Sequence, residues 1–403
     1  MPLLHLQPPF RAEHLGSLRR PAYLLEKRAQ FDSGEISRDE LRPAEEKAIQ
    51  EIVQLQKELG LKAVTDGEFT RHMFFDGVFN NLDGFEHIPD VPLERFMDYV
   101  PDTAGFKELN FKKADSYMCK SKIKRTKSFY RAEFEYTKSL LPSEKHKDIK
   151  LTICAPEWFH LRHGPYAYPL DVYKTDEEYF ADISRAYREE IAELYSLGCR
   201  NIQFDDPLLA YFCSEKMLAG MKEAGVDSER LLQLYINVYN DCLEGRPADM
   251  NVGVHLCRGN FKARSQHSGG RHFSEGGYDR IAVKLFNELN VDCYYLEYDT
   301  ERAGTFEPLK HLPKHKTVVL GLVTSKFPQL EDPEEMKQRV HSAAEIISHG
   351  VESRTKAEAF HQICISPQCG FASHSLGNEV TDEDMANKLK LVVKVAGELW
   401  SDA

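Results

Sequence analysis

A histidine and a cysteine stand two positions apart at the end of a short β-branched segment, Asn251–Cys257. Residues two apart in a strand share a face, so His255 and Cys257 are predicted to point inward together, whereas Val252, Val254 and Leu256 would face the surrounding helices. Imidazole and thiolate groups are ligands that zinc accepts readily. Taken alone, the His-x-Cys pair is weak evidence, because a buried histidine next to a buried cysteine is common.

Further candidate ligands follow other apolar segments. Glu297 ends the segment Asp292–Glu297, and Cys369 lies in the loop Ser366–Gly370. The segment Asn201–Asp205 is not counted among the ligands, but Gln203 and Asp205 are expected to face inward at its end. A zinc ion with two thiolates and one carboxylate would carry a net charge of −1, so the carboxylate is the ligand expected to yield to an incoming thiolate. Such a site would bind a substrate thiol and present its sulfur as a nucleophile.

The segments that must position these residues alternate along the chain between short apolar runs typical of strands and longer amphipathic runs typical of helices. Helical periodicity between the apolar segments predicts parallel βαβ units, and eight such units would close a TIM (β/α)8 barrel with its active site at the carboxyl ends of the strands. The fold predicted is therefore α/β; the alternative is an open doubly wound sheet, but no Gly-x-Gly-x-x-Gly follows a strand. The expected strands are 62–66, 149–154, 201–205, 251–255, 292–297, 317–323 and 362–366, with a weaker one at 11–15, and the expected helices include 177–197, 228–243, 278–289 and 333–349.

Two long connections interrupt this pattern, after the second and fifth expected strands. They are residues 67–148 and 259–274, and we expect both to be insertions within one elaborated domain, 1–403. The first insertion must contain structure of its own, since loops of that length are rare. It includes a basic run that is either a solvated face or a surface for the acidic tail of a substrate: Lys120, Lys122, Lys124, Arg125 and Lys127.

The composition restricts the class of protein. The 403 residues are 42% hydrophobic and 29% charged, with a formal net charge of −12, which does not favour a nucleic-acid binder. No apolar run is long enough for a membrane span and the amino terminus does not look like a signal peptide, so a cytoplasmic location is expected. Nine cysteines without regular spacing do not indicate a disulfide framework. Most are expected to be small buried residues.

Seven segments in a fixed order resemble the cobalamin-independent methionine synthase family, and most closely its short single-domain relatives. They span almost the full length of the chain. The segments are Phe10–Pro21, Thr65–Glu68, Gln203–Pro207, His255–Asn260, Leu296–Asp299, Leu320–Lys326 and Ser366–Gly370.

This resemblance implies a zinc-containing TIM barrel that transfers a methyl group to the thiol of homocysteine. By motif, the zinc ligands would be His255, Cys257, Glu297 and Cys369. The family positions that hold the amino-acid part of homocysteine correspond to Ser17, Glu68 and Asp205, and the two carboxylates suit an ammonium group. Trp158 falls near the aromatic residue on which the family stacks a pterin, although core packing explains it equally well.

The chain departs from the family in ways that concern the methyl donor. It lacks the duplicated half that helps to hold the polyglutamate tail of the folate. The segment Val323–Pro328 lacks the family's Asp and His, of which the histidine is the proposed proton donor. Lys326 stands near that position and could donate a proton or bind an anionic group. The donor could therefore be a methylated, polyglutamylated folate or another electrophile, such as a methylcorrinoid, a sulfonium or an epoxide, and the acceptor could be a different thiol.

Two other classes remain open from the sequence. One is a metal-free lyase similar to uroporphyrinogen decarboxylase, which shares the barrel superfamily. The other is a non-catalytic barrel that binds methionine or a related amino acid. Metal analysis would distinguish the metal-free lyase from a zinc-dependent methyltransferase. Turnover with any methyl donor would distinguish the methyltransferase from a barrel that only binds an amino acid.

Overall fold

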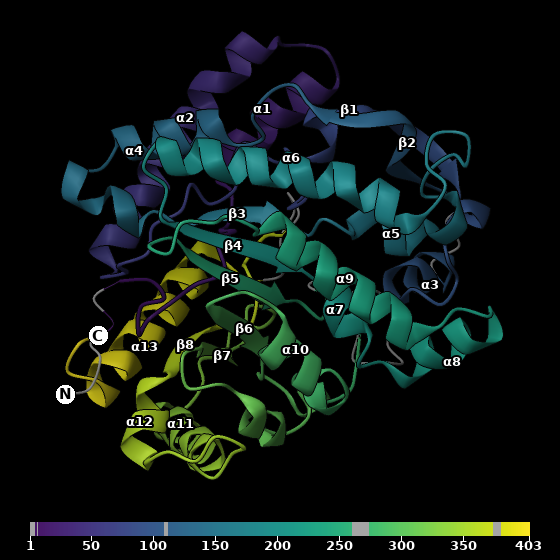
Figure 1. Ribbon diagram of the computed structural model, residues 1–403. Helices are drawn as coiled ribbons and strands as arrows, with labels where there is room; N and C mark the ends of the chain where they lie inside the picture. Colours follow the sequence, from purple (N-terminus) through teal and green to yellow (C-terminus); the bar gives the residue numbers. More distant parts are fainter. Residues whose placement is uncertain (1–4, 6, 109–111, 260–273, 374–379) are drawn as a thin grey trace.

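The central element of the protein is a six-stranded parallel sheet, seen here in a computed structural model that describes residues 5, 7–108, 112–259, 274–373 and 380–403. The strands pair in sequence order from β3 to β8, and Figure 1 shows helices packed around them. This arrangement confirms the α/β class and the parallel sheet expected from the sequence. The strands are β3 (Leu151–Cys154), β4 (Asn201–Asp206), β5 (Asn251–Leu256), β6 (Cys293–Glu297), β7 (Thr317–Val323) and β8 (Ile363–Pro367).

Long helices follow most of these strands, as the periodicity predicts. Their starts are set by side chains that accept hydrogen bonds from the first turn: Thr175 caps α6 and Asp227 caps α9. The expected helix 278–289 is instead a short 3-10 turn followed by α10. The helices are α1 (Ala22–Asp32), α2 (Arg38–Glu58), α3 (Pro101–Glu108), α4 (Arg131–Ser139), α5 (Trp158–His163), α6 (Asp176–Ser196), α7 (Leu208–Tyr211), α8 (Glu215–Glu223), α9 (Ser228–Cys242), α10 (Ala282–Glu288), α11 (Pro333–Ser348), α12 (Lys356–His361) and α13 (Asp382–Leu399).

Two of the eight expected strands form only single parallel bridges at the edges of the sheet. Ala12 pairs with Ile365 beside β8, and Val64 pairs with Ile149 before β3. Val64 bonds through both of its backbone groups to Asp148 and Lys150, whereas those of Thr65, which point to the opposite edge, bond to the side chain of Gln56 at 2.9 Å and 2.8 Å. The prediction of full strands at 11–15 and 62–66 was therefore wrong.

The segment between Gly67 and Asp148 carries a two-stranded antiparallel sheet that the sequence did not predict. Its strands are β1 (Leu82–Pro92) and β2 (Lys113–Arg125), and they lie away from the main sheet in Figure 1. Helices α3 and α4 belong to the same segment. The second expected insertion, 259–274, lies outside the described residues except at its two ends.

The two faces of the main strands bury different side chains. Val252, Val254 and Leu256 of β5 belong to the large hydrophobic cluster between the sheet and the helices. A separate, small cluster on the other face includes Cys293 and Tyr295 of β6. This confirms the predicted orientation of β5, in which His255 lies on the inward face. Among the described residues, no helix is long and apolar enough to cross a membrane.

Candidate metal centre and active-site cavity

The structure brings the four candidate ligands together at the carboxyl ends of the strands. His255 lies near the end of β5 with Cys257 just beyond it, Glu297 ends β6, and Cys369 follows β8. One ligand atom from each residue lies within 4.8 Å of the corresponding atoms of the other three. His255, Glu297 and Cys369 are at most 3% exposed, so the cluster is withdrawn from solvent.

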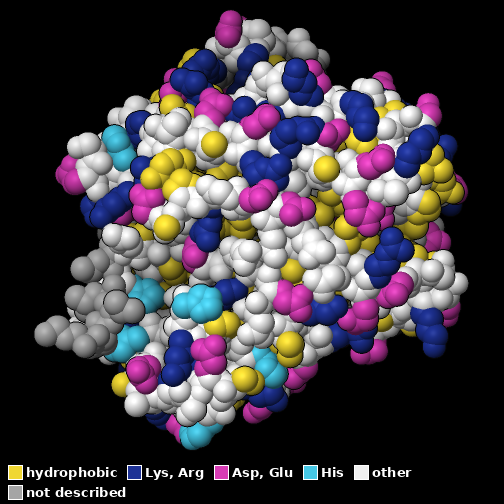
Figure 2. Space-filling view, viewed as in Figure 1, with side chains coloured by type: hydrophobic (Ala, Val, Ile, Leu, Met, Phe, Trp, Pro, Cys, Tyr) yellow, Lys and Arg dark blue, Asp and Glu magenta, His cyan; other side chains and the backbone are white. Residues whose placement is uncertain are grey.

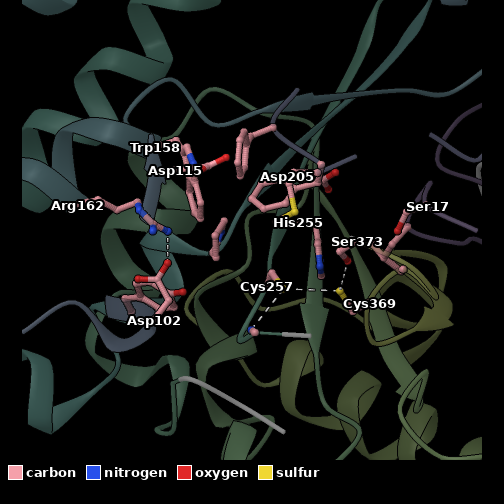
Figure 3. Close-up of a pocket in the computed structure, with 18 of the residues that line it drawn as sticks. Ser17, Asp102, Asp115, Trp158, Arg162, Asp205, His255, Cys257, Cys369 and Ser373 are labelled. Atoms are coloured by element: carbon pink, nitrogen blue, oxygen red, sulfur yellow. Dashed lines mark hydrogen bonds and ion pairs between the residues drawn. The ribbon is translucent and has the colours of Figure 1, made fainter. Parts of the chain in front are cut away.

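Contacts around the cluster orient its ligand atoms. The sulfur atoms of Cys257 and Cys369 are 3.6 Å apart (Figure 3). The backbone N–H of Arg258 donates to Glu297 Oε1 at 2.9 Å. His255 Nδ1 lies 3.3 Å from the carbonyl of Tyr295, which makes this nitrogen the donor. In the neutral ring that a metal ligand requires, the lone pair would be on Nε2, which makes no hydrogen bond to a described residue.

The acidic groups of the cluster lie close enough to shift one another's pKa values. The thiol of Cys257 donates to Cys369 and so holds the pKa of Cys369 well below its usual range, while the same contact raises that of Cys257. Burial lowers the pKa of His255, but the Cys369 sulfur and two nearby carboxylates outweigh it and raise the value to about 9. Burial raises the pKa of Glu297 to about 7 against the opposing charge of Lys326. A bound cation would relieve this crowding.

The donor set fits a zinc ion. Two thiols, one imidazole and one carboxylate are the ligand types that zinc binds, and the remaining nitrogen of the imidazole contacts a backbone carbonyl, as is usual for zinc-binding histidines. The uncommitted Nε2 of His255 points to the same conclusion, because a buried nitrogen without a partner is costly.

A cavity of about 310 Å³ opens beside the cluster. His255, Cys257 and Cys369 form part of its wall, and Figure 3 shows Trp158, Arg162 and Asp102 across from them. Its described lining residues are Leu15, Ser17, Met73, Phe74, Phe75, Asp102, Ala114, Asp115, Trp158, Arg162, Asp205, Pro207, Tyr211, His255, Cys257, Gly259, Cys369, Gly370 and Ser373.

Two of the three residues expected to hold an amino acid line this cavity. Ser17 lies against the loop that carries Cys369, since the N–H of Phe371 donates to the carbonyl of Ser17 at 2.9 Å. Asp205 reaches the cavity from the end of β4. Burial raises its pKa to about 6, opposed first by the charge of His255.

Glu68 lies behind the cavity and is not among its described lining residues. Its Oε1 accepts a hydrogen bond from Thr152 Oγ1 at 2.7 Å, and Arg71 Nη1 is 3.8 Å away. Burial raises the pKa of Glu68 to about 8 despite the charge of Arg71. Glu68 also has a positive φ of 62°, a backbone conformation that non-glycine residues adopt rarely and often at functional sites.

The far wall of the cavity is aromatic. Trp158, at the start of α5, stacks on Phe75 with 5.5 Å between ring centroids and meets the edge of Phe74 at 5.0 Å. Arg162 forms a buried ion pair with Asp102 of α3 and lies over the Trp158 ring, 4.8 Å from its centroid. The sequence pointed to Trp158 alone. The others were not predicted, although the position of the 67–148 segment after a strand end was a signal that it could reach the site.

Lys326 lies next to the cluster, outside the described lining of the cavity. Its Nζ is 3.8 Å from Glu297 Oε2 and 3.8 Å from Asp299 Oδ2, and all three side chains are at most 4% exposed. These contacts are with carboxylates of the protein itself and test neither role considered for Lys326, proton donation or binding of an anionic group. The role itself stays a prediction.

The basic run of the first insertion is divided by the strand on which it lies. Lys120, Lys122 and Lys124 of β2, and Lys127 beyond it, are exposed. Arg125 instead points inward and pairs with Glu190 and Glu193 of α6. The exposed surface is therefore made by the four lysines without the arginine.

Comparison with known proteins gives a consistent picture. The sequence model described as cobalamin-independent synthase, catalytic domain, matches residues 170–398. The chain is 35% identical to the uncharacterized protein YxjH of Bacillus subtilis, over 97% of this chain and 95% of that protein. It is 23% identical to a methionine synthase of Sulfolobus acidocaldarius, over 96% of this chain and 92% of that protein.

Solved structures show the same likeness. A Listeria monocytogenes protein, provisionally described as a vitamin-B12-independent methionine synthase, has a TM-score of 0.72 and 31% identity, covering 98% of this chain and 99% of its own. A B12-independent methionine synthase from Shewanella in complex with selenomethionine has a TM-score of 0.65 at 18% identity, covering 96% and 97%, which supports the fold. The chain therefore belongs to the cobalamin-independent methionine synthase family.

Proposed function

We propose that this protein is a zinc-dependent methyltransferase whose acceptor is the thiol of homocysteine. The observation that carries this proposal is the convergence of His255, Cys257, Glu297 and Cys369 within 4.8 Å at the wall of a cavity. Family membership supports methyl transfer, and the names of characterised relatives support methionine as the product.

The four residues would hold the ion, and the remaining polar groups would hold the substrate. A Zn²⁺ ion in this ligand set would lower the pKa of a substrate thiol and keep its sulfur nucleophilic near neutral pH. Asp205 and Ser17 line the cavity beside the cluster, where a carboxylate and a hydroxyl can accept from and orient the ammonium group of an amino acid. Glu68 would support the same group from behind the cavity wall.

The apolar end of the cavity is the proposed site of the methyl donor. Phe74, Phe75 and Trp158 offer flat apolar surfaces there, suited to a ring system such as the pterin of 5-methyltetrahydropteroyl-glutamate. An amine leaving group must be protonated as the methyl group departs. If the donor is a folate, Lys326 is the candidate acid predicted from the sequence; its contacts with Glu297 and Asp299 favour a role in holding carboxylates. A donor with a better leaving group, such as a sulfonium, would need no acid.

We further propose that the parallel sheet is the larger part of one closed (β/α)8 barrel formed by a single domain, 1–403. The two edge bridges add the segments around Ala12 and Val64 to the six strands. The remaining seam is spanned by contacts between these two segments. Leu18 N–H donates to the carbonyl of Gly67 at 3.1 Å, and Thr65 Oγ1 donates to that of Gly16 at 2.8 Å.

The proposal is tested with zinc-loaded protein and homocysteine in a panel of methyl donors. The panel contains methylated folates with one and three glutamates, a methylcorrinoid and a methylsulfonium. Methionine formation that disappears in the Cys257→Ser variant and persists in Cys242→Ser, a buried cysteine of α9 away from the cluster, would support it. Full activity of metal-free protein, or methionine binding without turnover on any donor, would contradict it.

A further inference from the structure

Gln203 connects two segments that line the cavity. Its side chain is completely buried on the inward face of β4, two residues before Asp205. Its Nε2 donates to Asp205 Oδ1 at 2.7 Å and to the carbonyl of Leu15 at 3.0 Å. One amide group therefore holds both the Asp205 carboxylate and the chain segment that leads to Ser17.

A buried cation determines which way this amide points. Lys150 Nζ donates to Gln203 Oε1 at 3.3 Å. A flipped amide would place its NH2 group against the ammonium and its oxygen against two acceptors, Asp205 Oδ1 and the Leu15 carbonyl. Because lysine has only donors and a carboxylate accepts, the observed orientation is the one that satisfies all three contacts.

Lys150 is itself fixed beneath the cavity. It pairs with Glu13, donates to the carbonyl of His14 at 2.5 Å, and lies over the ring of Tyr295 at 4.5 Å. The side chains of Lys150 and Glu13 are fully buried, and neither is among the described lining residues of the cavity. The cation therefore reaches the cavity lining through Gln203 and through the backbone of His14, which precedes Leu15.

We propose that Gln203, oriented by Lys150, is the positioning residue for recognition of the α-amino group of the substrate. It fixes the direction of the Asp205 carboxyl group and keeps the Leu15–Ser17 segment beside it. This inference deepens the proposed function and rests on its assignment of Asp205 to the ammonium group. It makes the protein selective for thioethers and thiols that carry an α-ammonium group.

The experiment compares two ligands by calorimetry on zinc-loaded protein. L-Methionine carries the ammonium group, and 4-(methylthio)butanoate is the same molecule without it. In Gln203→Met, which keeps the volume and removes the donor, methionine should bind about tenfold more weakly, as expected for the loss of a hydrogen bond to a charged group. Binding of the butanoate should not change.

Controls separate this role from a structural one. Gln362→Met removes another buried amide, which contacts Arg354 and two backbone carbonyls just before β8, and it should leave both affinities unchanged. Lys150→Arg, which keeps the cation if the protein tolerates it, should retain selectivity for methionine. Equal weakening of both ligands in Gln203→Met, or no weakening, would overturn the inference. If Asp205→Asn leaves methionine binding unchanged, or if methionine does not bind the wild type, the assignment of Asp205 to the ammonium group is wrong. The proposed function then fails independently of the role of Gln203.

Discussion

A lysine ammonium buried between two carboxylates cannot be removed without leaving charges unpaired. Lys326 is in this position beside Glu297 and Asp299, with at most 4% of any of the three side chains exposed. Loss of one partner of a buried ion pair is strongly destabilising, because the remaining charge stays desolvated. At this site the uncompensated charges would adjoin the proposed metal ligands.

Replacement of Lys326 by Met should therefore lower the free energy of unfolding by about 3 kcal/mol. Adding Asp299→Asn should restore part of that loss, since it removes one of the two carboxylates that faced the ammonium group. Urea denaturation of the two variants measures both effects.

The matched control is Lys337→Met on α11. Its ion pair with Glu398, at 2.9 Å, is more exposed, so the substitution should cost about 1 kcal/mol or less. A Lys326→Met protein as stable as this control, but inactive, would instead support proton donation by Lys326.

At the scale of residues, the site could be predicted where local rules apply. The two-residue period of a strand was enough to place His255 and Cys257 on one face. Cys369 and Ser17 lie in loops, where no periodicity applies; Cys369 was a candidate because its loop follows an expected strand, and resemblance to a family supplied Ser17. Gln203 was expected to face inward, but its contact with Lys150 joins residues 53 positions apart and is visible only in three dimensions.

At the scale of elements, one histidine joins three parts of the structure. His163, at the end of α5, lies 2.8 Å from the carbonyl of Arg95 through Nδ1 and 2.6 Å from Ser116 Oγ of β2 through Nε2. It thereby fastens the β1–β2 sheet to the helix that carries Trp158. Burial disfavours the imidazolium and lowers the pKa of His163 from 6.5 to about 4.

This pKa shift predicts a pH dependence of stability. The unfolded chain takes up the proton first, so the free energy of unfolding should fall as the pH drops from about 6.5 to about 4. The contribution of His163 between pH 7 and pH 4.5 is about 2 to 3 kcal/mol. Urea denaturation at both pH values should show a decrease that is smaller by this amount in His163→Gln than in the wild type.

His349→Gln provides the comparison, because its side chain is 75% exposed. This variant should keep the pH dependence of the wild type. An identical decrease in His163→Gln and the wild type would show that the histidine is not held neutral in the folded protein.

The sequence did not predict some elements because their local sequences disfavour the secondary structure that they adopt. Strand β1 contains two prolines and a glycine, residues that disfavour strand interiors, so its pairing with β2 depends on tertiary contacts. The six strands of the main sheet are buried apart from the first residues of β5 and β7, and they were recognised from the sequence. The segments around Ala12 and Val64 look like strands in sequence, but each pairs with the sheet at a single residue, and the backbone groups of Thr65 bond to the side chain of Gln56.

At the scale of the whole molecule, the charge is negative overall but mixed in its distribution. The formal net charge is −12, yet Figure 2 shows cationic and anionic side chains interspersed over the face in view. The exposed lysines 120, 122, 124 and 127 are thus a local basic feature on an acidic protein. Such a feature can attract an anionic chain, and salt would weaken the attraction.

If these lysines contact the polyglutamate tail of a folate donor, their replacement by Ser should affect long-tailed substrates selectively. The KM for a triglutamate should rise roughly three- to tenfold, as expected for several exposed charge contacts, and that for a monoglutamate should not change. Steady-state kinetics with the two folates measures the difference.

Lys390→Ser with Lys394→Ser removes two exposed lysines of α13 and should change neither KM. Equal increases for both folates in the β2 variant would assign the four lysines to ordinary solvated surface.

The central claim is that His255, Cys257, Glu297 and Cys369 bind one zinc ion, and zinc content is its most direct test. Protein equilibrated with zinc and then freed of excess metal should contain one zinc per chain in the wild type and in Cys242→Ser. Cys257→Ser and Cys369→Ser should contain much less, because each loses a thiolate ligand. Equal zinc in all four proteins, or none in the wild type, would contradict the account.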